Sequence, residues 1–251
     1  MRFLEFGKEN QRVLVMFHAS CMTWEFLEES IRLLAERFQV IVPVLPGYDL
    51  EDDSEYTSVE AIAAETEDWL LSGGYGEIHG LYGVSMGGSI CVRLLANGRI
   101  RVKKAVIDAG ITPYRLPAWL ADLFVWRDTW FMLMLKGSMR FFARFVPEKK
   151  YGSDTFARLR QVMEHATRNT IRHNFRSCHT YTMPDPVAGQ DTEIRYWYGS
   201  LETWLRSRDA RFVRRCFPRT KKEVLRGCNH AEFVMLHPDA FAGKLSGFLE
   251  H

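Results

Sequence analysis

The chain has 251 residues and a formal net charge of +2, with 47% hydrophobic and 25% charged residues. This composition is typical of a folded globular protein and excludes a disordered chain, a collagen-like fibre and a small disulfide scaffold. The small net charge argues against electrostatic binding of the whole chain to nucleic acid. The length fits one large α/β domain, or one domain that carries a sizeable insertion.

The N-terminal segment and the cysteines favour a cytoplasmic protein. The first eleven residues contain neither the long apolar run nor the small-residue cleavage site of a signal peptide, and no stretch approaches about 18 apolar residues. The five cysteines are scattered and form no C-x-x-C pair, so the sequence suggests neither a disulfide framework nor a zinc site. We therefore expect a protein without membrane insertion.

Aliphatic and β-branched runs alternate with longer amphipathic stretches along much of the chain. Strands are predicted at residues 3–6, 13–18, 40–44, 78–84, 105–108, 194–198 and 223–225. Helices are predicted between the early strands, at residues 24–37, 58–71 and 86–96. This alternation predicts an α/β fold, with a mostly parallel central sheet and helices on both of its faces.

The alternation stops between residues 113 and 190, where the sequence has a helical pattern interrupted at proline and glycine. We therefore predict a core formed by residues 1–112 and 191–251, with a helical insertion at 113–190. The insertion contains 12 Lys or Arg and 6 Asp or Glu, so it is net +6 and the remaining chain is net −4. Most of these cations are expected on solvated helix faces; the alternative is recognition of an anionic substrate.

The most specific motif is the G-x-S-x-G sequence of residues 83–87, which follows an apolar strand and opens a helical pattern. A serine on such a tight turn has a strained backbone, and the flanking positions need glycine because side chains there would collide with the neighbouring strand and helix. The turn exposes the Ser85 hydroxyl and aims the backbone N–H of Met86 toward the same point. We predict Ser85 as a nucleophile and Met86 as an oxyanion donor; the alternative is an ordinary glycine-rich turn.

These residues resemble the nucleophile motif of the α/β-hydrolase family, and the resemblance extends over most of the chain outside the insertion. Residues 13–18 followed by Trp24 look like the family's first core strand and oxyanion loop, and residues 44–48 look like the loop after its next strand. Residues 227–232 and 237–241 look like its catalytic-histidine loop and closing helix. The resemblance implies the α/β-hydrolase fold, with the insertion as a helical cap over the site.

A serine nucleophile needs a base, and the base needs a carboxylate that fixes its tautomer. The resemblance implies the chain order serine, acid, histidine. His230, in a turn-rich loop after the last strand, is the predicted base. Glu202, three residues after the strand-ending Gly199, is the predicted acid. Asp108 remains the alternative acid, because some relatives take this residue from the end of that earlier strand.

The resemblance also places the second oxyanion donor in the loop of residues 18–22. Ser20 is favoured, and Cys21 is the alternative because Ala19 stands where the family usually has glycine.

The insertion is unusually rich in aromatic residues and methionine, which could form an adaptable apolar pocket. Some of these side chains must instead attach the insertion to the core. The tryptophans expected to line the substrate pocket are Trp24, Trp119, Trp126 and Trp130.

Together these features imply a serine hydrolase that cleaves an ester or related carbonyl compound with an apolar part, without a metal or organic cofactor and without a nucleic-acid partner. Thioesterase, C–C bond hydrolase, lyase and acyltransferase reactions use the same triad and remain alternatives. A ligand-binding receptor that retains the fold is an alternative of another class. The sequence determines neither the substrate nor the oligomeric state.

Overall fold

The structure is a computed structural model that describes residues 1–113, 117–145, 147–189 and 191–251. Within these residues seven strands form one sheet in the order β1-β3-β2-β4-β5-β6-β7. Strand β1 is antiparallel to β3, and every other pair is parallel. This confirms the predicted α/β fold with a mostly parallel sheet. The strands are β1 (Arg2–Phe6), β2 (Val13–Phe17), β3 (Gln39–Val44), β4 (Glu77–Val84), β5 (Arg101–Asp108), β6 (Glu193–Gly199) and β7 (Thr220–Leu225).

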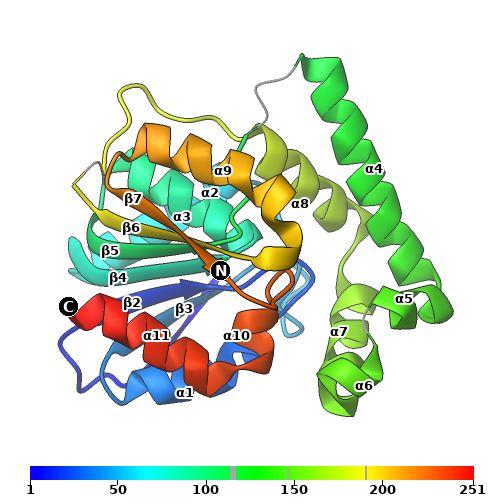
Figure 1. Cartoon of the computed structure of the whole chain (residues 1–251), viewed down its shortest axis with the longest axis horizontal. Coiled ribbons are helices and arrows are strands. Elements are labelled where there is room, and N and C mark those ends of the chain that lie inside the picture. The colour runs from blue at the N-terminus through cyan, green and yellow to red at the C-terminus, as the bar shows by residue number, and fades with distance from the viewer. Residues whose placement is uncertain (114–116, 146, 190) are drawn as a thin grey trace.

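Helices cover both faces of the sheet (Figure 1). Because side chains alternate along a strand, β2 supplies both layers: Val15 and Phe17 join the core under α2 and α3, whereas Leu14 and Met16 join the core under α1 and α11. Helix α9 lies on the same side as α2 and α3. The core helices are α1 (Glu28–Ala35), α2 (Val59–Ser72), α3 (Met86–Asn97), α9 (Thr203–Cys216), α10 (Glu232–Leu236) and α11 (Pro238–Glu250).

The predicted helix at residues 24–37 is divided into two parts. A 3-10 turn, η1 (Trp24–Leu27), precedes α1, and the Glu28 N–H bonds to the Glu25 carbonyl three residues earlier. Such tight turns are common where a helix begins. A second 3-10 turn, η2 (Ser200–Glu202), connects β6 to α9.

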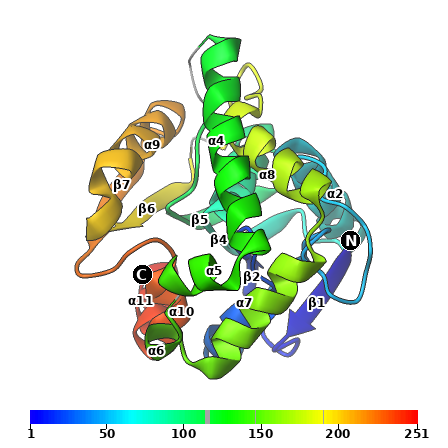
Figure 2. The ribbon, with the colours of Figure 1, turned by 90° about the vertical axis from the view of Figure 1, so that its right-hand side faces the viewer.

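Among the residues that the structure describes between β5 and β6 there are five helices, and we call them the α4–α8 segment: α4 (Ala118–Gly137), α5 (Met139–Phe145), α6 (Glu148–Tyr151), α7 (Ser153–His165) and α8 (Arg168–Thr180). This segment lies beside one end of the sheet, and α4, α5 and α7 form its outer side (Figures 1 and 2). Helix α8 contacts α2, α3 and α4. The predicted insertion, residues 113–190, includes residues 114–116, 146 and 190, which lie outside the described residues. In the part of the chain that is described, no helix combines the length and apolarity needed to cross a bilayer.

Strand register places three site candidates at one edge of the sheet. Val84 of β4 pairs with Asp108 of β5, which in turn pairs with Trp197 of β6. Since the strands are parallel, Asp108 at the end of β5, Ser85 directly after β4 and the η2 turn with Glu202 directly after β6 all lie at this edge. The α4–α8 segment lies at the same end of the core.

Close packing around the turn after β4 makes Gly87 intolerant of a side chain. A Cβ atom there would lie 2.6 Å from the Phe17 carbonyl oxygen and 2.8 Å from that of His18. We expect Gly87→Ala to lower the free energy of unfolding, measured by urea titration, by about 1–3 kcal/mol. Gly243→Ala is the control, because a Cβ atom there meets nothing within 4 Å, and on α11 it should raise stability by about 0.5–1 kcal/mol. Equal losses in both variants would contradict the packing argument.

Candidate active site

Ser85 occupies the turn between β4 and α3 with φ 56° and ψ −115°, a conformation that is rare for a residue with a side chain. The turn is held because the Ser85 N–H donates to the Asp108 carbonyl oxygen at 2.8 Å, and the Ser85 carbonyl accepts from the Ser89 N–H at 3.1 Å. A Cβ atom at Gly83 would lie 2.3 Å from the Gly87 carbonyl oxygen. The two glycines therefore allow the strand and helix to approach closely, and the Ser85 hydroxyl lines a cleft.

Two hydrogen bonds connect Ser85, His230 and Glu202. The Ser85 Oγ lies 2.8 Å from His230 Nε2, and His230 Nδ1 lies 2.8 Å from Glu202 Oε2. A carboxylate can only accept, so Nδ1 carries the proton and Nε2 is free to accept from the serine hydroxyl. The arrangement can therefore take a proton from Ser85 while the carboxylate stabilises the charged imidazole.

The Glu202 carboxylate is fixed by three donors. Besides His230, it accepts from the Gly199 N–H at 3.3 Å and from Arg206 Nε at 3.1 Å, and Arg206 also bonds to Asp209 at 2.6 Å. Burial opposes ionisation of Glu202, but the hydrogen bond and charge of His230, together with Arg206, outweigh burial and hold its pKa below the ordinary value. Glu202 is thus both oriented and kept ionised.

Asp108, the alternative acid, has a different environment. Its side chain is buried and accepts a hydrogen bond from the Tyr82 hydroxyl at 3.0 Å. Burial, opposed in part by this hydrogen bond and by the charge of His230, raises its pKa to about 6. The structure brings Glu202 into contact with His230 and places Asp108 against Tyr82 instead.

The loop after β2 is braced by a neutral histidine. His18 Nδ1 lies 3.0 Å from the Ala19 carbonyl, and Nε2 accepts from the Leu45 N–H at 3.3 Å. Full burial lowers the pKa of His18 to about 4, which suits a ring that must accept one of these bonds. Ser20 lines the cleft with Ser85, whereas Cys21 is buried with φ 58° and does not line it.

The α4–α8 segment reaches this loop directly. Asn174 on α8 is fully buried, accepts from the Ser20 hydroxyl at 2.9 Å and donates to the Met86 sulfur. One side chain therefore connects the segment to both loops expected to supply the oxyanion donors.

The cleft at Ser85 encloses about 480 Å³ between the core and the α4–α8 segment. Its apolar wall comes from the loop after β2, from α4 and α8, and from the start of α9. A His179–Asp128 pair, with Nε2 and Oδ2 3.0 Å apart, adds a polar group between α8 and α4. The apolar lining residues are Ala19, Met22, Ile111, Met132, Phe175, Leu201, Trp204 and Leu205.

None of the four tryptophans predicted for the pocket lines this cleft. Trp24 packs against the Phe6 ring, with centroids 5.7 Å apart. Helix α4 buries Ala121 and Val125 and contacts α8, which turns its tryptophans outward. Trp119, Trp126 and Trp130 are 69%, 62% and 51% exposed.

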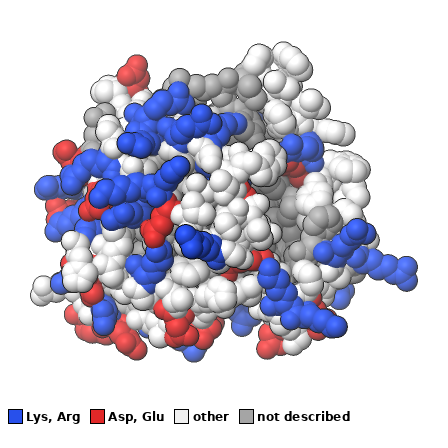
Figure 3. Space-filling model, viewed as in Figure 1, with Lys and Arg blue, Asp and Glu red and all other residues white. Residues whose placement is uncertain are grey.

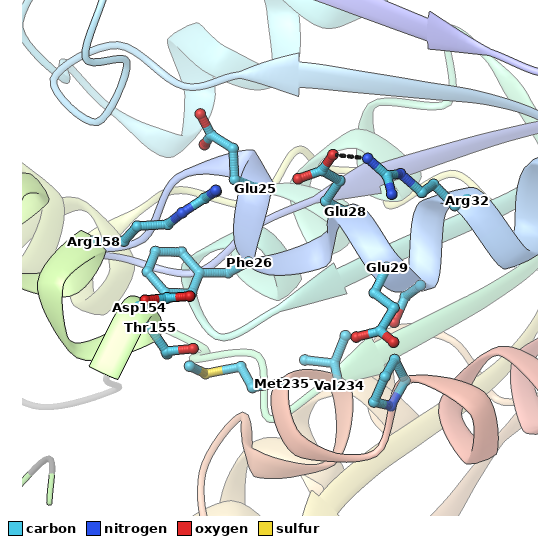
Figure 4. Close-up of a pocket in the computed structure, with 12 residues that line it drawn as sticks. Glu25, Phe26, Glu28, Glu29, Arg32, Asp154, Thr155, Arg158, Val234 and Met235 are labelled. Atoms are coloured by element: carbon cyan, nitrogen blue, oxygen red, sulfur yellow. Dashed lines mark hydrogen bonds and ion pairs between the residues drawn. The ribbon is translucent and has the colours of Figure 1, made fainter. Parts of the chain in front are cut away.

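A second cleft lies where α7 approaches η1 and α1 (Figure 4). Arg158 of α7 lies across from Glu25 of η1, and Glu28 pairs with Arg32 at 2.6 Å. Its lining comes from α7 on one side and from η1, α1, α10 and α11 on the other, so it lies where the α4–α8 segment meets the core. None of the predicted site residues lines it.

Two residues of the Ser85 site were missed in the sequence. Arg206 follows Glu202 by four residues, a spacing that places two side chains on one helix face and could have indicated the pair. Asn174 lies 154 residues from Ser20, and no local pattern connects the two.

The sequence from residue 14 to 244 matches the model of the alpha/beta hydrolase family. Because the match covers most of the chain, the protein belongs to this family, and the resemblance stated above is confirmed. A comparison with curated protein sequences finds no match.

Solved structures share the same fold. An alpha/beta hydrolase family protein from Desulfitobacterium hafniense has a TM-score of 0.81 and 18% identity, over 99% of this chain and 100% of that chain. MenH from S. aureus has a TM-score of 0.75 and 19% identity, over 99% and 97%. A structure from a study of carboxylesterases of Nitrososphaera gargenis has a TM-score of 0.73 and 18% identity, over 99% and 93%. At these identities the likeness shows the fold.

The raised pKa of Asp108 predicts a pH-dependent stability. Its pKa of about 6 exceeds the ordinary 3.8, so the folded state prefers the protonated form and loses stability as pH rises between these values. Across this range Asp108→Asn should gain stability relative to the natural protein, by on the order of 2 kcal/mol in urea titrations. Asp53→Asn, at an exposed position, is the control. A difference between Asp108→Asn and the natural protein that stays constant with pH would contradict the prediction.

Proposed function

We propose that this protein is a serine hydrolase that cleaves an ester or related carbonyl compound through an acyl-enzyme intermediate. The observation that carries the proposal is the pair of 2.8 Å contacts from Ser85 to His230 and from His230 to Glu202. Ser85 also has a strained backbone conformation in the turn directly before α3, which is the geometry expected of a nucleophile.

In the first step the Ser85 Oγ attacks the substrate carbonyl carbon while its proton passes to His230 Nε2. The tetrahedral intermediate collapses, the leaving group takes that proton, and the acyl group stays on Ser85. Water then donates a proton to Nε2 as its oxygen attacks the acyl carbon. The second tetrahedral intermediate collapses by breaking the bond from the acyl carbon to Ser85 Oγ, Oγ takes the proton back from Nε2, and the acid product departs. Glu202 holds the Nδ1 proton throughout and stabilises the imidazolium that forms twice.

The negative oxygen of each tetrahedral intermediate needs donors that are already in place. Met86 is the first residue of α3, so its N–H is unpaired within the helix and has the helix dipole behind it. The Ser20 N–H is the proposed second donor, because Ser20 lines the cleft and Cys21 does not. Asn174 would fix both donors through its contacts with the Ser20 and Met86 side chains.

The cleft favours a substrate with an apolar part. Its lining combines Met22, Met132, Phe175 and Leu205 with the polar His179–Asp128 pair on the side of the α4–α8 segment. We propose that this segment acts as a cap, because α4 and α8 supply much of the wall opposite the core. Flexible methionines suit an acyl chain or ring better than one rigid shape.

A fluorophosphonate probe tests the nucleophile. The folded protein should carry one label on Ser85 by peptide mass spectrometry, and Ser85→Ala should carry none and lose at least about 10³-fold in hydrolysis of p-nitrophenyl esters. Ser20→Ala keeps its backbone N–H and should still be labelled on Ser85. A folded protein that takes no label would favour a ligand receptor, and activity confined to acetate esters would contradict an apolar cleft.

Separate substitutions test the acid. Glu202→Gln should lower kcat by about 10²–10⁴-fold, because the amide neither fixes the productive tautomer nor stabilises the imidazolium. Asp108→Asn should keep most of its turnover, since Asp108 does not contact His230. A folded Asp108→Asn variant that alone loses turnover would assign the acid to Asp108.

A further inference from the structure

The strongest positive charge on the core lies on α9 and β7. Residues 203–222 contain eight Lys or Arg and one acidic residue, Asp209, which is buried and paired with Arg206. Within the described residues, no ion pair joins the exposed cations of this region to a carboxylate. We call these cations the basic face: Arg211, Arg214, Arg215, Arg219, Lys221 and Lys222. Figure 3 shows the cluster over α9 and the β7 edge.

The insertion is therefore not the only cationic part of the molecule, as its net +6 suggested. The chain outside the insertion has a net charge of −4, yet it contains the basic face, and residues 203–222 include no exposed acidic residue. Such a face attracts a polyanionic surface over several ångströms.

Apolar side chains continue this surface toward the Ser85 cleft. Leu201, Trp204 and Leu205 are 65%, 79% and 42% exposed, and we call them the apolar rim. All three also line the cleft that contains Ser85. Arg211 follows Trp204 by seven residues, and Arg215 follows Arg211 by four. These spacings place Trp204 and two cations of the basic face on one face of α9.

Helix α4, which supplies part of the opposite wall of the cleft, carries a second exposed stripe on its outward face. Trp119, Leu123, Trp126 and Trp130 recur at helical spacing on α4 and are all more than half exposed. The rings of Trp126 and Trp130 stack with centroids 6.3 Å apart. The same helix contributes Met132 to the cleft wall, so exposed tryptophans stand on the helices that form both sides of the cleft.

Local requirements of the fold explain only part of this surface. Arg214 and Arg215 lie in the last turn of α9, where cations favour the helix dipole. Lys221 and Lys222 lie on the edge strand β7, where charge prevents pairing with another sheet. Neither reason accounts for the exposed indole of Trp204 or the exposed Leu201.

We propose that the basic face and the apolar rim dock the protein on an anionic lipid bilayer, with the Ser85 cleft opening toward the lipid. Cations meet the lipid phosphates, while tryptophan and leucine enter the interfacial region that these side chains prefer. Nucleic acid is disfavoured because Leu201 and Leu205 offer nothing to phosphates or base edges. A lipid-borne ester would then be the substrate class, a consequence that rests on the proposed function.

Vesicle flotation with the full chain tests the docking without any need for hydrolysis. Vesicles of phosphatidylcholine with roughly one third phosphatidylglycerol should bind at least about tenfold more tightly than pure phosphatidylcholine, and the difference should shrink as salt is added. The triple variant Arg211→Glu, Arg214→Glu, Arg215→Glu should lose this preference, and Trp204→Ser should weaken binding to both kinds of vesicle. Ser85→Ala should bind like the natural protein.

The matched control is Arg158→Glu, Arg168→Glu, Arg172→Glu, which makes the same charge change at exposed positions of α7 and α8 and should retain anionic binding. An equal loss in both triple variants would overturn the assigned surface. No binding to anionic vesicles, retention of a duplex RNA probe alone, or a stable dimer that buries Trp204 would overturn the proposal.

Hydrolysis separates the two proposals. The α9 triple variant should cleave a soluble p-nitrophenyl ester as fast as the natural protein, yet lose at least about fivefold on the same ester carried in anionic vesicles. Vesicle binding without hydrolysis of either ester would contradict the proposed function and leave the docking intact. Undiminished hydrolysis of the vesicle-borne ester by the α9 variant would overturn the link between docking and substrate.

Discussion

The positive φ of Ser85 is the constraint on which the rest of the site depends. A chain that leaves a buried strand and enters a helix within one residue can do so only if the strand and helix approach closely. Gly83 and Gly87 permit that approach, and the Asp108 carbonyl fixes the Ser85 amide from the neighbouring strand. The Ser85 hydroxyl therefore lies at the same edge of the sheet as η2 and the loop that contains His230.

The two carboxylates at this edge, Glu202 and Asp108, differ in pKa because their burial and their hydrogen-bond partners differ. Glu202 receives donors from His230, Gly199 and Arg206 and stays ionised. Asp108 accepts a hydrogen bond from Tyr82, and its burial raises its pKa to about 6. Position along the chain could not separate these two carboxylates, whereas their hydrogen-bond partners do.

The arginines of the protein also differ between the cleft and the outer surface. Inside the cleft, arginine is paired with carboxylates, as at Arg206. On α9, no described carboxylate forms an ion pair with Arg211, Arg214 or Arg215, and the same helix exposes Trp204. A basic face that adjoins an apolar rim at the mouth of the site is the arrangement expected of an enzyme that works at a charged interface.

The sequence by itself determined the α/β fold and the glycines of the Ser85 turn, because strand alternation and turn chemistry are local properties. The resemblance to the family, and not a local pattern, implied the order of the site residues and pointed to Glu202 and His230. Tertiary structure alone decided which face of α4 meets α8, and so turned Trp119, Trp126 and Trp130 outward. It alone brought Asn174 to Ser20, since a contact across 154 residues depends on how the layers pack.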